Sequence, residues 1–187
     1  MLYACVDMGI EGLELGSAAY SVAPHLDLDG LLVSQEARDQ YLAAVEKRGL
    51  KIVAFNCSGN PVHPGELGKR HREDFDKTLA LAKLMGVTTI VAQSGLPAGA
   101  PNDEHPNFIT HTFPPSCSEI LEYQWGITID YWKKAAKKAK ECGVEKIALE
   151  NHPNNMVFNV STIRRLRDAV GRCTYQSLEL CSSRIWT

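Results

Sequence analysis

The sequence predicts an α/β fold built on a parallel sheet, because one structural unit recurs along its 187 residues. In each unit an amphipathic segment with helical periodicity ends at a glycine, and a short apolar run with a polar end follows. Strands that alternate with helices in this way form parallel sheets. The spacing of the closing glycines is that of βα units with one long insertion. These glycines are Gly9, Gly49, Gly86 and Gly143, which lie 40, 37 and 57 residues apart.

The first two units fill the first third of the chain. Residues 1–8 are expected to form the last turns of a helix, and residues 10–16 a short strand. Residues 35–48 carry apolar side chains on one helical face, and Gly49 follows where a left-handed cap belongs. Residues 50–55 form the second expected strand, and both strands end in polar residues.

The next two units repeat the pattern. The third combines a helix over residues 69–85 with a strand over 87–92, and the fourth combines a helix over 131–142 with a strand that ends at Glu150. The lysines of the fourth helix fall on its outer face, so solvation explains this basic run. One more helix is expected over residues 160–170.

The end of the fourth strand is the segment most informative about function. Residues 147–149 are apolar and lie between Gly143 and Pro153, which favours a buried strand over a piece of helix. Glu150 is then the first side chain to leave the core. A carboxylate at such an edge is costly to desolvate unless a cation, a donor or water meets it. Glu150 is therefore a candidate site residue.

Two parallel-sheet architectures fit these elements, the doubly wound sheet and the (β/α)₈ barrel, and both bind ligands at the carboxyl ends of the strands. No G-x-G-x-x-G or G-x-x-x-x-G-K-[ST] motif follows a strand, which removes the main support for a doubly wound nucleotide binder and favours the barrel. A Pro-rich insertion over residues 94–123 is expected to cover the site. The polar residues at the strand ends are Glu14, Asn56, Gln93, Glu150 and His152.

Composition narrows the class of protein. A hydrophobic content of 44% supports a real core, and a net charge of -2 provides no broad basic surface, so nucleic acid is not expected as a partner. The six cysteines include no C-x-x-C pair, which indicates free thiols in a reducing compartment. The first residues lack a signal-peptide pattern and no apolar run reaches about 18 residues. We therefore expect a cytoplasmic protein without a membrane segment.

Four segments together resemble a known family. They are E-L-G at 14–16, N-C-S-G-N-P at 56–61 with His63, T-H-T-F-P-P at 110–115 and A-L-E-N-H-P at 148–153. These segments resemble the xylose isomerase-like TIM barrels described as sugar phosphate isomerases and epimerases, with a similarity that covers residues 1–171. The resemblance implies a partial (β/α)₈ TIM barrel with parallel strands and outer helices.

The resemblance also implies a site and a chemistry. In this family two glutamates, an aspartate and a histidine bind one divalent cation, and a proton moves between adjacent carbons of a ketose or aldose through an enediolate. Glu150 corresponds to the first glutamate and would be both ligand and acid/base group, while Glu179 falls about where the aspartate belongs. The cation would be Mn²⁺, Mg²⁺, Co²⁺ or Zn²⁺. His63, His152 and Asn56 would bind the hydroxyl groups of a carbohydrate substrate.

Against the family pattern, the chain is expected to be an incomplete barrel that lacks the first strand and the C-terminal units. Residues 1–171 are expected to form the barrel domain, and residues 172–187 a divergent tail with Ser182 where the family has a histidine. Open barrel edges would favour association with a second copy of the chain. The alternative function is therefore a non-catalytic partial barrel that binds a partner or itself. An endonuclease of the same fold is a third, minor hypothesis.

Overall fold

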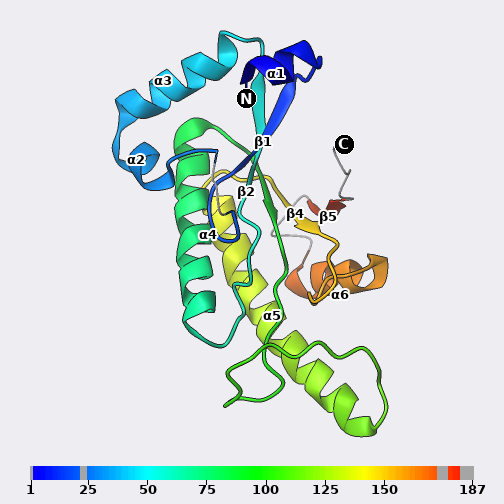
Figure 1. Cartoon of the computed structure of the whole chain (residues 1–187). Helices are drawn as coiled ribbons and strands as arrows, with labels where there is room; N and C mark the ends of the chain where they lie inside the picture. Colours follow the sequence, from blue (N-terminus) through cyan, green and yellow to red (C-terminus); the bar gives the residue numbers. More distant parts are fainter. Residues whose placement is uncertain (1, 22–24, 172–176, 182–187) are drawn as a thin grey trace.

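A computed structural model describes residues 2–21, 25–171 and 177–181, the last of these as backbone (Figure 1). The described residues form one five-stranded parallel sheet in the order β1-β2-β3-β4-β5. The elements in chain order are α1 (Leu2–Asp7), β1 (Gly12–Gly16), α2 (Leu28–Val33), α3 (Gln35–Glu46), β2 (Lys51–Asn56), α4 (Glu66–Met85), β3 (Thr89–Ala92), α5 (Pro115–Glu141), β4 (Lys146–Glu150), α6 (Val160–Val170) and β5 (Ser177–Cys181).

The predicted alternation of helix, glycine and strand is confirmed. Each of the four closing glycines has a positive φ, 72° at Gly9, 70° at Gly49, 69° at Gly86 and 78° at Gly143. Only glycine adopts this left-handed conformation without a steric penalty from Cβ, and the turn that it makes sends the chain back toward the sheet. The glycines therefore fix where each helix stops and where the next strand begins.

The two long helices α4 and α5 lie side by side along the sheet (Figure 1). Phe75 of α4 and Trp132 of α5 meet edge to face with ring centroids 5.7 Å apart, and Lys138 pairs with Asp76 at 2.6 Å across the same contact. Trp132 is fully buried and donates its indole N–H to the Ser94 carbonyl oxygen at 3.0 Å. Helix α5 is thereby anchored to the loop that follows β3.

The sheet buries its two faces in two separate clusters. Phe55, Ile90 and Leu149 belong to the large core on the helix side. Ala54, Val91 and Ala148 alternate with them along β2, β3 and β4 and form a second, small cluster. Because side chains alternate across a strand, this second cluster marks the other face of the sheet.

Two helices differ from the sequence-based expectation. Helix α5 begins at Pro115, so the expectation of an irregular insertion as far as residue 123 is wrong for 115–123. Proline is well suited to the first turn of a helix, where its missing N–H is not needed, but next to Pro114 it resembled a loop. The six-residue α2, capped by Asp27, was not anticipated because so short a helix has little periodicity.

A fifth strand follows α6. β5 pairs in parallel with β4, with Leu149 opposite Leu180, and it lies beyond the four strands that were expected. The rest of the predicted tail, residues 172–176 and 182–187, lies outside the described residues, so the division of the chain at residue 171 stays a prediction. Among the described helices, none combines the length and hydropathy needed to cross a membrane.

We predict that Leu79→Ala lowers the free energy of unfolding by about 3 kcal/mol, because Leu79 is fully buried on α4 and the substitution leaves a cavity. Leu84→Ala on the same helix is the matched control. Leu84 is 50% exposed, so its truncation should cost less than about 1 kcal/mol. Urea denaturation of both variants checks this, and equal losses would contradict the packing described for α4.

Candidate functional site

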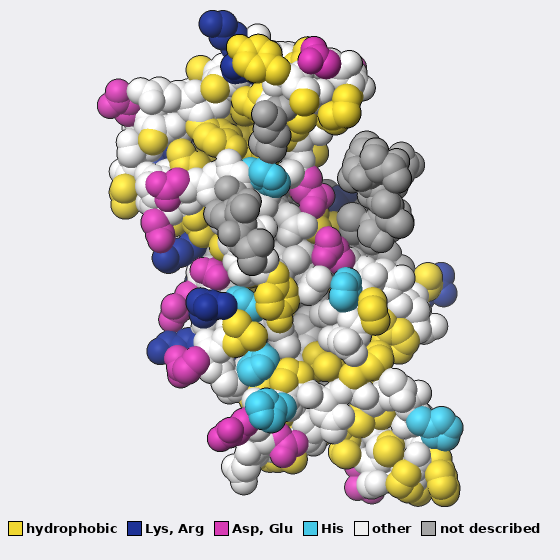
Figure 2. Space-filling model, in the orientation of Figure 1, with side chains coloured by type: hydrophobic (Ala, Val, Ile, Leu, Met, Phe, Trp, Pro, Cys, Tyr) yellow, Lys and Arg dark blue, Asp and Glu magenta, His cyan; other side chains and the backbone are white. Residues whose placement is uncertain are grey.

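Polar side chains continue the small cluster of the sheet toward the carboxyl ends of the strands. Asn56, Gln93 and Glu150 each stand two residues after Ala54, Val91 and Ala148, respectively. Residues two apart on a strand share a face. The three polar side chains therefore lie on the face turned away from the main core. Figure 2 shows acidic and histidine side chains gathered over the middle of the molecule in this view.

Hydrogen bonds join these side chains into one chain of contacts across four strands. Asn56 Nδ2 donates to Glu14 Oε1 at 2.7 Å, and the Ser58 backbone N–H donates to Asn56 Oδ1 at 2.9 Å. Glu150 Oε2 then accepts from Ser58 Oγ at 2.9 Å and from Gln93 Nε2 at 3.3 Å. We call Glu14, Asn56, Ser58, Gln93 and Glu150 the polar row.

Within the polar row, Glu150 is the residue best placed to take part in a reaction. Its side chain is half-buried, and both donors meet the same oxygen, Oε2. Oε1 has no hydrogen-bond partner among the described residues. Two donors on one oxygen fix the plane of the carboxylate and leave the other oxygen to accept a proton, a substrate hydroxyl or a cation.

Backbone contacts hold Ser58 in place. The Tyr20 N–H donates to the Ser58 carbonyl oxygen at 3.0 Å, so the loop after β1 supports the loop after β2. Ser17 Oγ donates to the Asn56 carbonyl oxygen at 3.0 Å and contacts Thr78 Oγ1 of α4 at 2.9 Å. The serine that orients Glu150 is thus positioned by three elements.

The predicted site residues divide into two groups. Asn56 and Glu150 lie in the polar row, as the strand ends indicated. His63 instead accepts the Gly65 N–H through Nδ1 at 3.0 Å within a turn, and the exposed His152 has Nδ1 at 2.7 Å from the Pro153 carbonyl oxygen. Neither histidine is hydrogen-bonded to the row, and their role in binding substrate stays a prediction.

Glu179 is placed by its backbone alone. Its Cα pairs with Ala148, whereas Glu150 pairs with Cys181. Two residues of a parallel strand span about 6.6 Å, so the backbone of Glu179 lies about that far from the level of Glu150, toward the amino ends of the strands. Its assignment as a metal ligand remains a prediction, since its side chain is outside the described part of the chain.

The described side chains do not form a complete metal centre. Within residues 2–21 and 25–171, no group of three or more histidine, cysteine, aspartate or glutamate side chains is arranged to hold an ion. A catalytic zinc site usually needs three protein ligands. Glu150 fits one position of such a site, and the described residues do not supply the others.

Sequence reasoning missed Ser58 as the residue that orients Glu150 and did not select Gln93 as its second partner. The signal for Gln93 was present, because it directly follows β3 just as Asn56 ends β2. Ser58 had no such signal, because it lies beyond the strand in a loop, and only the turn that Asn56 Oδ1 makes with the Ser58 N–H brings it back.

Comparison with known proteins identifies the family. A family model described as the xylose isomerase-like TIM barrel matches residues 2–181, and the chain belongs to this family. It is 52% identical over 174 residues to the uncharacterized protein YfiH of Bacillus subtilis (strain 168), an alignment that covers 91% of this chain and 56% of YfiH.

Two solved structures show the same fold. The IolI protein with a binding zinc atom has a TM-score of 0.58 and 18% identity, and the alignment covers 93% of this chain and 54% of that one. D-psicose 3-epimerase with D-tagatose, from Clostridium cellulolyticum H10, has a TM-score of 0.58, 16% identity and the same coverages, 93% and 54%. The chain thus spans just over half the length of YfiH and of these two structures.

We predict that His105→Ala raises the pKa of His63. Burial lowers the pKa of His63 first, and the nearby His105 lowers it further because two imidazolium charges repel. Removing His105 removes the second effect and leaves the first. Titration of His63 by NMR measures the change.

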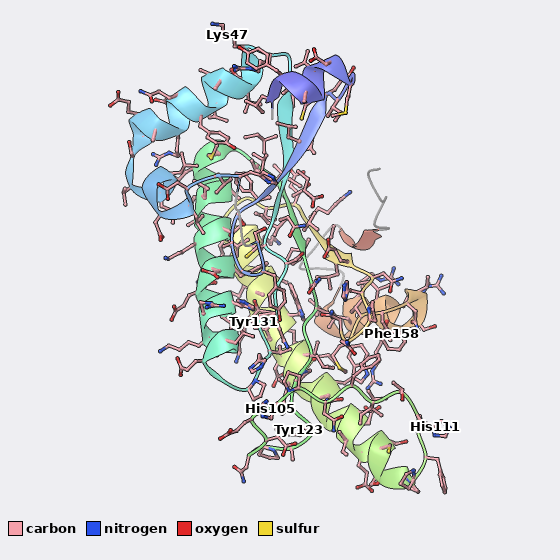
Figure 3. The ribbon with its side chains drawn as sticks, viewed as in Figure 1. Lys47, His105, His111, Tyr123, Tyr131 and Phe158 are labelled. Carbon is pink, nitrogen blue, oxygen red and sulfur yellow. The ribbon has the colours of Figure 1, made fainter. Side chains whose placement is uncertain are left out.

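The matched control is His111→Ala. His111 lies in the same insertion but well apart from His105 (Figure 3), and its Nδ1 accepts the Phe113 N–H at 3.0 Å. This substitution should leave the titration of His63 unchanged. An equal shift in both variants would contradict a direct interaction between His63 and His105.

Proposed function

We propose that this chain carries the acid/base half of a carbohydrate isomerase or epimerase, with Glu150 as the group that moves the proton. The observation that supports the proposal is the half-buried Glu150 carboxylate at the end of β4, held through one oxygen by Ser58 and Gln93. Membership of the xylose isomerase-like family and the likeness to a D-psicose 3-epimerase favour a ketose or aldose as substrate.

The geometry suits proton transfer at carbon. Glu150 Oε1 would take a proton from the carbon next to a substrate carbonyl. The C–H electron pair would form the double bond of an enediolate, and the carbonyl π pair would move to its oxygen. Return of the proton to the adjacent carbon gives isomerisation, with the hydroxyl proton passing to the former carbonyl oxygen. Delivery of a proton to the opposite face of the same carbon, by a second acid on that face, gives epimerisation.

The rest of the polar row would bind and orient the substrate. Asn56 and Glu14 already share a hydrogen bond at 2.7 Å, so their remaining donor and acceptor positions are fixed in direction. Such preorganised groups suit a row of sugar hydroxyls, which both donate and accept. His63 and His152 are further candidates for contacts at the margin of the row.

We also propose that Glu150 is one ligand of a divalent cation, Mn²⁺, Mg²⁺, Co²⁺ or Zn²⁺. The zinc-bound IolI structure supports a metal in this fold, and a carboxylate oxygen is a suitable ligand for each of these ions. The other ligands would come from side chains beyond the described ones, with Glu179 as a candidate. When bound, the cation would stabilise negative charge on the enediolate oxygens.

The setting that we propose is the cytoplasm, with a free carbohydrate or its phosphate as the ligand. Cys5, Cys57, Cys117 and Cys142 are free thiols, which suits a reducing compartment. A second copy of the chain remains the proposed partner at the open edges of the sheet, where backbone groups of an unpaired strand can pair. Neither nucleic acid nor a membrane is part of the proposal.

Glu150→Gln should abolish proton exchange at the substrate carbon, because the amide cannot take up the proton. We expect a loss of at least about 100-fold. The assay incubates the full chain with a panel of ketoses and ketose phosphates in D₂O and follows deuterium incorporation by NMR. Glu145→Gln, an exposed carboxylate beside β4, is the matched control and should retain full exchange. Exchange that persists in Glu150→Gln would refute the proposed role.

Metal binding is tested separately by calorimetry with Mn²⁺ on the full chain. Glu150→Ala should weaken binding at least about tenfold, because it removes a charged ligand, and Glu145→Ala should not change it. Identical Mn²⁺ affinity in the parent chain and in Glu150→Ala would mean that Glu150 is not a ligand. This result would leave the acid/base role open to the exchange assay.

A further inference from the structure

We infer that His71, a fully buried residue of α4, is a positioning residue for Glu150 and acts through the loop that carries Ser58. This inference rests on the proposed function, because it concerns how the proton-transferring carboxylate is oriented. His71 is not hydrogen-bonded to the polar row in the described part of the chain, so its effect on Glu150 would be indirect.

The His71 imidazole accepts a hydrogen bond from the loop after β2. The Asn60 backbone N–H donates to His71 Nδ1 at 2.9 Å, and this contact is buried. Because an N–H can only donate, Nδ1 carries no proton, and the neutral ring bears its proton on Nε2. Asn60 lies two residues after Ser58, so this bond fixes the far end of the short segment 58–60.

The same ring supports the rest of that segment. A Cβ added to Gly59 would lie 2.9 Å from His71 Nδ1, so no side chain fits between this part of the loop and the imidazole. The Tyr20 ring meets the imidazole edge to face with ring centroids 4.7 Å apart, and the Tyr20 N–H donates to the Ser58 carbonyl oxygen at 3.0 Å. Each residue of the segment 58–60 therefore contacts the imidazole or a residue that packs against it.

The surroundings keep the imidazole neutral. Burial lowers the pKa of His71, and the positive charge of Arg70 lowers it further. Asp74 raises this pKa and His63 lowers it, and both effects are smaller than that of burial. Because the net shift is downward, the neutral ring prevails near pH 7, and the Nδ1 lone pair stays available to the Asn60 N–H.

The second ring nitrogen shows that packing alone does not account for a histidine at this position. His71 Nε2 is buried and has no hydrogen-bond partner in the described part of the chain. A buried polar atom without a partner is destabilising, and an apolar side chain of similar size would avoid this cost. Such a side chain could not accept the Asn60 N–H. The advantage of histidine therefore lies in the position of the loop, and with it of the Ser58 hydroxyl that donates to Glu150 Oε2 at 2.9 Å.

His71→Leu and His71→Asn separate positioning from packing. Leucine keeps most of the buried volume and removes the acceptor, whereas asparagine is smaller and places an amide oxygen at the same number of bonds from Cα as Nδ1. In the D₂O exchange assay on the ketose panel, His71→Leu should lower kcat at least about tenfold and change KM less than about twofold, because a displaced Ser58 misorients the carboxylate. His71→Asn should restore kcat to within about threefold of the parent chain.

A readout without substrate keeps this inference separate from the proposed function. NMR spectra of the full chain should show the His71 ring as the Nε2–H tautomer. The ¹³C signal of the Glu150 carboxyl group should move in His71→Leu and return toward the parent position in His71→Asn. Leu79→Ala, which truncates another buried side chain of α4, is the matched control, and it should lose stability yet leave that signal in place.

The outcomes distinguish the two proposals. No exchange in the parent chain, together with the expected carboxyl shifts, would refute the proposed function and support the positioning role of His71. A proton on Nδ1, an unmoved Glu150 signal in a folded His71→Leu, or a larger loss of kcat in His71→Asn than in His71→Leu would each overturn that role. Gly59→Ala replaces His71→Leu if the latter does not fold, because its Cβ pushes the segment 58–60 off the ring, and an unmoved Glu150 signal there would count against the role equally.

Discussion

The arrangement of the candidate site depends on one buried set of hydrogen bonds at Ser94–Leu96, directly after β3. Ser94 Oγ accepts the Val157 N–H at 2.8 Å, and its carbonyl oxygen accepts the Trp132 indole N–H at 3.0 Å. Leu96 and the Asn60 side chain exchange two hydrogen bonds of 2.9 and 3.0 Å, as two peptide groups would. The loops after β2, β3 and β4 and the helix α5 are thereby tied together. A buried network with its main groups paired specifies one arrangement of these loops. Any displacement would leave buried polar atoms without a hydrogen-bond partner and away from water.

This constraint explains why the polar row is ordered although it lies at strand ends. Gln93 immediately precedes the buried segment, so its backbone position is set by the same contacts that hold α5. Ser58 precedes Asn60 by two residues and is held from the other side by Tyr20. The donors that meet Glu150 thus come from two loops that the Ser94–Leu96 segment fixes relative to each other. A carboxylate oriented by rigid neighbours needs little reorganisation when it accepts a proton, which is the advantage that preorganisation gives to an acid/base group.

The sequence was sufficient for the features that follow from local periodicity. The positive-φ glycines, the strands and the position of Glu150 at the end of β4 all follow from patterns within about 20 residues, and the structure confirms them. The sequence was insufficient where tertiary contacts decide the local structure. Residues 115–123 are helical because Trp125 and Gln124, further along, are buried against the insertion. His63 accepts the Gly65 N–H within a local turn and is not hydrogen-bonded to the polar row. The role of Ser58 needed the positions of two loops at once, which no single segment encodes.

The polar row and a neighbouring apolar pocket share a support but differ in chemistry. The row is made of side chains on the sheet face turned away from the helices, and it offers polar groups on a half-exposed edge. The pocket is lined by the insertion after β3, α5 and the start of α6, and most of its lining is apolar. Leu96 connects the two, since it lines the pocket and bonds to Asn60 of the loop that carries Ser58. The cost of desolvating polar groups therefore favours a polar substrate at the row and disfavours it in the pocket.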